Sequence, residues 1–195
     1  MTVPLMLHFV NGYPGVKLRI VRGSIESQLQ ALRARALDAI VVDVNALGAA
    51  TDLRIERLPD LRANFLVRVH HPLAVQATVT LDQMRQYPIV SAILSDLAER
   101  RLRERFGPDG DPQQLITLRC EDIMSCIEVT LASDTIFLGV LAVVRERITR
   151  GELVELQMQP PYVTHANLGI VTLAGRSETS LMPMLRNFVF AHMHD

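Results

Sequence analysis

Short apolar segments alternate with segments of helical period along almost the whole chain, and this alternation restricts the possible folds more than any other feature. Residues 16–21 alternate in polarity, which is typical of a strand. A helix is predicted next, because Ser24 is a suitable N-cap and apolar residues recur at helical spacing through Ala36. The all-apolar run 39–42 then predicts a buried strand. Together these segments predict a β-α-β unit with parallel strands and a right-handed crossover.

The same alternation continues to the end of the chain. Further strands are predicted at 53–58, 64–69, 88–91, 114–118, 135–138, 153–156 and 167–173. Further helices are predicted at 96–106, 121–132, 139–147 and 181–193. Residues 107–112 are dense in Gly, Pro and Asp and predict a surface loop. The chain is therefore expected to form an α/β fold with mostly parallel sheets.

Five motifs follow one another in this pattern, and most join a short apolar strand to a turn or a helix. They are Phe9-x-x-x-Tyr13-Pro14-Gly15-Val16-x-Leu18, Gly23-Ser24 with Ala36-Leu37-Asp38-Ala39-Ile40, Phe65 to Val69 with His71-Pro72-Leu73-Ala74, Ser133 to Leu141, and Leu168-Gly169-Ile170-Val171. In this order they resemble the effector-binding domain of LysR-type transcription regulators. The resemblance covers nearly the whole chain. One departure is Ser133-Asp134-Thr135, which stands where the family carries a small, glycine-rich turn.

The resemblance implies an α/β fold of two Rossmann-like lobes joined by two crossover strands, as in type 2 periplasmic binding proteins. Lobe I would comprise residues 1–68 and 169–195, and lobe II residues 69–168. The crossing strands would be 64–69 and 167–171. By this resemblance the chain begins inside the family's first helix. The first strand of lobe I and the N-terminal helix-turn-helix are then missing, which we attribute to truncation.

The resemblance also implies a small-molecule effector in a cleft between the lobes. In open parallel sheets, strand carboxyl ends and helix N-termini face such a crevice, and helix N-termini favour anions. Nine residues at such positions, or at the crossing, are the candidate effector contacts: Ser24, Val69, His70, Ser91, Ala92, Cys120, Glu121, Asp122 and Ile123. The alternative is structural, with Ser24 as a plain N-cap, Ser91 at a strand-end turn and the carboxylates at a helix N-terminus. A small organic acid or related metabolite is expected, although Glu121 and Asp122 would favour amine or hydroxyl groups if they face it.

The charge balance argues against direct contact between this chain and nucleic acid. Lysine and arginine number 20 and aspartate and glutamate 21, whereas DNA-binding domains carry a clear basic excess. DNA is therefore expected to be contacted only through the missing N-terminal domain. We predict no cofactor and no metal, because the candidate His192-x-His194-Asp195 lies at the exposed end of the chain and lacks a supporting shell. The sequence shows no secretory signal and no membrane-spanning apolar run, which predicts a cytoplasmic protein with reduced Cys120 and Cys126.

Three functions remain open at this level. The first is a sensor without enzymatic activity. The second is a solute-binding protein of a transporter, which would need an export signal. The third is a small-acid dehydratase, which would need a positioned acid/base pair. For the sensor, the resemblance implies a homodimer or tetramer in which the helix near 4–11 and the strand 16–21 of one subunit meet the helix near 140–147 of another.

Overall fold

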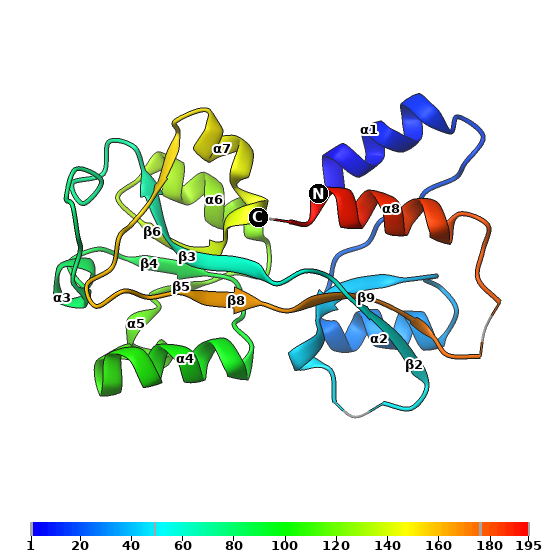
Figure 1. Cartoon of the computed structure of the whole chain (residues 1–195), viewed down its shortest axis with the longest axis horizontal. Helices are drawn as coiled ribbons and strands as arrows, with labels where there is room; N and C mark the ends of the chain where they lie inside the picture. The colour runs from blue at the N-terminus through cyan, green and yellow to red at the C-terminus, as the bar shows by residue number, and fades with distance from the viewer. Residues whose placement is uncertain (1, 49, 176, 195) are drawn as a thin grey trace. The chain divides into compact units, whose positions relative to one another are not determined.

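The computed structural model describes residues 2–48, 50–175 and 177–194, and its strands and helices alternate along the chain (Figure 1). The chain divides into two units, each of which is described by itself. Unit 1 comprises Met1–Pro59 and Asn167–His194, and unit 2 comprises Asp60–Ala166. These divisions fall after residues 59 and 166, whereas the predicted lobes divide after residues 68 and 168. The role of the two lobes as halves of one ligand site stays a prediction.

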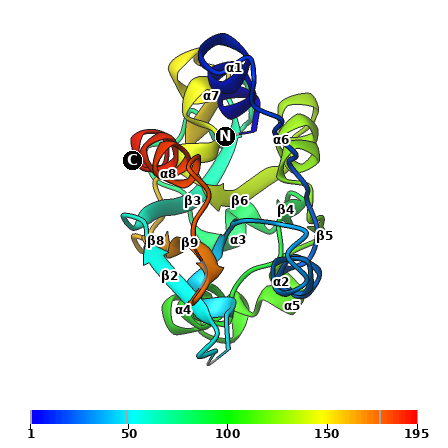
Figure 2. The same cartoon turned by 90° about the vertical axis from the view of Figure 1, so that its right-hand side faces the viewer.

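Unit 1 contains a three-stranded antiparallel sheet. Strand β9 (Leu168–Leu173) lies between β1 (Ile40–Asp43) and β2 (Leu53–Arg57). Helix α2 (Ile25–Arg33) packs beside this sheet (Figure 2). The buried residues that join helix and sheet are Leu32, Ile40, Val42 and Val171. A short 3-10 turn, η1 (Val44–Ala46), follows β1.

A second apolar cluster in unit 1 lies between two helices. Helix α1 (Thr2–Gly12) contributes Leu5 and Phe9, and α8 (Met182–His192) contributes Phe188. The two helices run alongside each other in Figure 1. Burial of these aromatic and aliphatic side chains attaches α1 to the rest of unit 1.

The predicted β-α-β unit at the start of the chain is wrong. Residues 16–21 form no strand in the described part of the chain, and β1 pairs antiparallel with β9. A strand is stable only when its backbone N–H and C=O groups are paired, and no neighbouring strand pairs with this segment among the described residues. The helix also ends earlier than predicted, at Arg33, because Arg35 takes a left-handed conformation (φ 61°).

Unit 2 is built on a six-stranded sheet with strand order β5-β4-β6-β3-β7, and β8 pairs with β3. Its strands are β3 (Leu61–Arg68), β4 (Ile89–Ser91), β5 (Leu118–Arg119), β6 (Ile136–Val140), β7 (Leu153–Glu155) and β8 (Thr164–Ala166). Its helices and 3-10 turns are α3 (Leu81–Met84), α4 (Asp96–Phe106), η2 (Gly107–Gly110), α5 (Pro112–Leu115), α6 (Ile123–Ala132), η3 (Leu141–Val143) and α7 (Arg145–Thr149). Strand β4 is parallel to β5 and β6, whereas β3 is antiparallel to its three partners. The prediction of mostly parallel sheets therefore holds only for β4 and its neighbours.

Both faces of the unit 2 sheet are buried. Along β3, Phe65 and Val67 pack with α3, α4 and α5, whereas Leu66 packs with α6 on the opposite face. The same alternation places Ile89 on the first face and Val90 on the second. Figure 1 shows α4 and α5 on one side of the sheet and α6 and α7 on the other. A sheet covered on both faces explains the uninterrupted apolar runs in the sequence.

Two predicted elements of unit 2 are wrong over most of their length, although residue 118 lies in β5 and residues 145–147 lie in α7. The segment 114–118 was expected to be a strand, but Pro112–Leu115 is a short helix, because Asp111 caps it and a proline occupies its first turn. The segment 139–147 was expected to be a helix, but β6 continues to Val140 and pairs with β3 there. A 3-10 turn and the short helix α7 follow. Among the described residues, no helix is long and apolar enough to cross a membrane.

Candidate functional site

Six of the nine predicted effector contacts lie together at one end of the unit 2 sheet. Strands β4 and β5 are parallel and end at Ser91 and Arg119, which are paired in register. The backbone N–H of Cys120 donates to the carbonyl oxygen of Ser91 at 3.2 Å. The six predicted contacts lie at or directly after the ends of these two strands. We call them the carboxyl-end site: Ser91, Ala92, Cys120, Glu121, Asp122 and Ile123.

Asp122 serves as the N-cap of α6. Its carboxylate accepts hydrogen bonds from the backbone N–H of Met124 (3.4 Å) and from the backbone N–H (3.3 Å) and hydroxyl (2.7 Å) of Ser125. The structural alternative predicted for this carboxylate is thus present. Glu121, its neighbour, is exposed. Two adjacent carboxylates give the carboxyl-end site a negative character.

Ser91 and Cys126 are the buried polar groups of this region. Ser91 is fully buried, and its hydroxyl has no hydrogen-bond partner among the described residues. The Cys126 thiol donates to the carbonyl oxygen of Cys120 at 3.6 Å. Burial raises the pKa of the Cys126 thiol to about 11. This sulfur is therefore a neutral thiol at physiological pH and a poor nucleophile.

Three exposed apolar residues adjoin the carboxyl-end site and were not predicted as contacts. Ile93 follows β4, Leu118 lies in β5, and Met124 lies in the first turn of α6. The sequence pattern does not indicate that these three apolar side chains are exposed, because their exposure depends on how distant residues cover β4, β5 and α6.

The other three predicted contacts lie elsewhere. Ser24 belongs to unit 1 and caps α2, where its side chain accepts from the backbone N–H of Ser27 at 3.3 Å. Val69 and His70 are exposed and follow β3 in unit 2. The joining of Ser24 with the carboxyl-end site in one cleft stays a prediction, since each unit is described by itself.

His71 is a buried histidine that was not predicted as a site residue. Its Nδ1 accepts from the backbone N–H of Leu73 at 3.0 Å, and its Nε2 lies 3.1 Å from the carbonyl oxygen of Asp134. Burial lowers the pKa of His71. The two contacts require a neutral ring with its proton on Nε2, and they hold the His71-Pro72-Leu73 turn against the start of β6.

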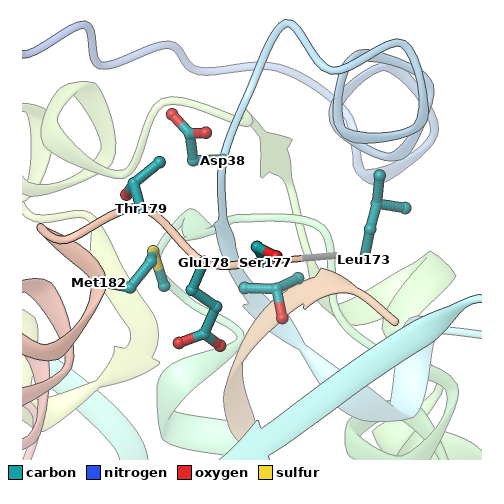
Figure 3. Close-up of a pocket in the computed structure, with 7 residues that line it drawn as sticks. Asp38, Leu173, Ser177, Glu178, Thr179 and Met182 are labelled. Carbon is teal, nitrogen blue, oxygen red and sulfur yellow. The ribbon is translucent and has the colours of Figure 1, made fainter. Parts of the chain in front are cut away.

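Two hollows of the described structure lie in unit 1. One has a volume of about 10 Å³, which is room for about one water molecule, and Glu178 and Met182 are among the residues that line it (Figure 3). The other is an open groove of about 460 Å³ between α1 and α8, with His8, Phe188 and His192 in its lining. Neither contains any of the nine predicted contacts. Within the described ranges, no three His, Cys, Asp or Glu side chains are grouped to hold a metal ion.

Comparison with known proteins gives one family match and many similar folds. The family model described as LysR substrate binding domain matches residues 1–193. A curated relative, the SDS degradation transcriptional activation protein of Pseudomonas sp. (strain ATCC 19151), is 23% identical over 184 residues. That match covers 93% of this chain but 59% of the relative, so the chain spans about three fifths of the relative's length.

Solved structures show the same fold. HinK, a LysR family transcriptional regulator from Pseudomonas aeruginosa, matches with a TM-score of 0.70 and 20% identity, over 97% of this chain and 64% of HinK. A putative transcriptional regulator from Vibrio parahaemolyticus matches with a TM-score of 0.71 and 20% identity, over 97% of this chain and 86% of that one. The Synechocystis PCC6803 CcmR regulatory domain, solved in complex with 2-PG, matches with a TM-score of 0.66 and 16% identity, over 97% of this chain and 90% of that one. The predicted α/β, type 2 periplasmic-binding-protein-like fold is thereby confirmed.

Proposed function

Because the chain belongs to the LysR substrate binding domain family, we propose that it is the part of a transcription regulator that senses a small-molecule effector. The observation that carries this proposal is the family match over residues 1–193. The named members of the family are regulators rather than enzymes, as the sequence predicted. A similar regulatory domain has been solved in complex with 2-PG, which supports a ligand-binding role here.

The effector would bind between the two lobes, with the carboxyl-end site as the contribution of unit 2 and Ser24 as a contribution of unit 1. The parallel pair β4 and β5 supports this placement, since ligands of open α/β sheets bind beyond the carboxyl ends of the strands. The family resemblance makes small organic acids the first class to test. Val69 and His70 would line the crossing from one lobe to the other.

Sensing requires that the effector binds one conformation of a dimer more tightly than another. A homodimer, or a tetramer built from it, is supported by an exposed apolar face on α1, formed by Val3, Met6, Leu7 and Val10. This chain carries nearly equal numbers of acidic and basic residues, so it would not contact DNA itself. DNA would be bound through a separate helix-turn-helix domain, and the regulator would act in the cytoplasm.

A thermal-shift screen of the full chain tests the proposal. The panel contains small carboxylates, amino acids, sugars and alcohols. An effector present at 100 times its Kd stabilises the folded state by about 2.7 kcal/mol, which raises the melting temperature measurably. The stabilising compound should lose its effect in an Ala92→Tyr variant, which adds bulk at a half-buried position of the carboxyl-end site. The same compound should still stabilise Val75→Ser, a control at an exposed residue of unit 2. A panel without any stabilising compound contradicts the proposal.

A further inference from the structure

The carboxyl-end site includes one apolar side chain that is open to solvent, Ile123, and adjoins three others, Ile93, Leu118 and Met124. The exposed fractions are 65% for Ile93, 45% for Leu118, 37% for Ile123 and 45% for Met124. The backbone holds these residues near one another, because Leu118 pairs with Val90 of β4 and Cys120 bonds to Ser91. Grouped exposed apolar residues mark binding surfaces more often than isolated ones do.

At the N-terminus of α6, the carboxylate of Asp122 already accepts the hydrogen bonds that an anionic ligand would use. Helix N-termini bind anions through N–H groups that lack an intrahelical partner. In α6, the N–H groups of Met124 and Ser125 are paired with Asp122 of the chain itself. An anionic ligand would have to displace this side chain or lie beside it, and both arrangements are unfavourable.

The surrounding charges also disfavour an anion. Glu121 is exposed next to Asp122, and the nearby cation Arg119 lies 3.7 Å from Glu99 and is compensated by it. The Ser91 hydroxyl at the end of β4 is buried and has no partner among the described residues. A hydroxyl can donate to or accept from an uncharged polar group, and an unpaired buried hydroxyl costs free energy.

From these observations we infer that unit 2 receives an apolar body bearing a hydroxyl or amino group, and that it discriminates against carboxylates. This inference rests on the proposed function. It favours the ligand with amine or hydroxyl groups, which the sequence suggested for the case that Glu121 and Asp122 face the effector, over a small organic acid. Apolar contact with Ile93, Leu118, Ile123 and Met124 would supply the affinity. The carboxylates of Glu121 and Asp122 would supply the discrimination.

The test compares three probes that share one six-carbon chain: hexan-1-ol, hexylamine and hexanoate. The full chain is labelled at isoleucine and methionine methyl groups, and the probes are titrated by NMR. We expect the alcohol and the amine to shift the methyl signals of Ile93, Ile123 and Met124 with a Kd at least about tenfold below that of hexanoate. Ile123→Asn should weaken the alcohol about tenfold. Val129→Asn, at a comparably exposed position of the same helix, should leave its binding unchanged.

Three other results would overturn the inference in different ways. If hexanoate binds here as tightly as the alcohol, the discrimination is wrong while the sensor function stands. If neither these probes nor any compound of the thermal-shift panel binds, the proposed function fails with it. If Ile123→Asn instead lowers the molar mass measured by light scattering, a second copy of the chain covers these side chains.

Discussion

A single histidine shows how much one residue depends on its surroundings. The motif His71-Pro72-Leu73-Ala74 predicted the end of a strand, and β3 does end just before it. The motif gave no indication that the ring is buried, tilted against Tyr87 with ring centres 4.5 Å apart, and bonded through both nitrogens. These contacts come from residues that are distant in sequence, so local spacing could not predict them.

His71 should make unit 2 sensitive to acid. Its folded pKa is lowered, so the unfolded chain takes up a proton at higher pH than the folded chain does. This contribution to stability is complete above the unfolded pKa of about 6.5 and is lost as the pH falls from there toward the folded pKa. Urea unfolding between pH 7.5 and about pH 5 should show a falling free energy of unfolding, and His71→Gln should flatten that dependence.

His71→Gln should also lower the free energy of unfolding at neutral pH by about 1–3 kcal/mol, because buried partners lose hydrogen bonds. The matched control is His165→Gln at an exposed position of β8. The control should keep both the stability and the pH dependence of the unmodified chain. If the free energy of unfolding of His71→Gln depends on pH as it does in the unmodified chain, a group other than His71 causes the dependence.

Among the predicted contacts, the sequence predicted the local roles better than the tertiary ones. The alternative to an effector contact was an N-cap for Ser24 and a favourable place at a helix N-terminus for Asp122, and both residues form N-caps. A cap depends on residues two or three positions away and is therefore encoded locally. The burial of Ser91 and the exposure of Ile93 depend on how β4 is covered by distant helices, which the sequence pattern does not specify.

At the scale of elements, the close contact between Gly110 and α4 leads to a stability prediction. A Cβ atom at Gly110 would lie 2.3 Å from the carbonyl oxygen of Leu102. Gly110→Ala should therefore lower the free energy of unfolding by about 1–3 kcal/mol, measured by urea denaturation. Gly12→Ala is the control, since no atom lies within 4 Å of a Cβ atom there. Equal effects of the two substitutions would refute this explanation.

Helices with a long apolar pattern were predicted well. Segments whose structure depends on pairing with a neighbouring strand were predicted poorly. The helix 96–106 was predicted with its observed bounds, because its cap and its apolar positions are local. The alternation at 16–21 predicted a strand, yet a strand also needs a neighbour that pairs with it. The apolar run that begins at Gly139 fits a helix and a strand equally well, and pairing of β6 with β3 decides for the strand.

At the scale of the whole molecule, the apolar face of α1 suggests how two chains associate. Met6 and Val10 are exposed on α1, whereas Leu5 and Phe9 of the same helix are buried against α8. A helix that exposes one apolar face and buries another is typical of an element shared between its own core and a partner. The dimer implied by the family resemblance uses this helix, and the exposed face is consistent with it.

The double variant Met6→Asp with Val10→Asp should weaken a dimer without unfolding unit 1, because neither side chain is buried in the single chain. Burial of one such apolar side chain contributes about 1.5–3 kcal/mol, so the dimer dissociation constant should rise at least about tenfold. Light scattering over a concentration series measures this change, and circular dichroism checks that the helices remain. Val75→Asp, at an exposed apolar residue of unit 2, is the control and should leave the dissociation constant unchanged. If the double variant dimerises as tightly as the unmodified chain, α1 is not the interface, and association must use another surface.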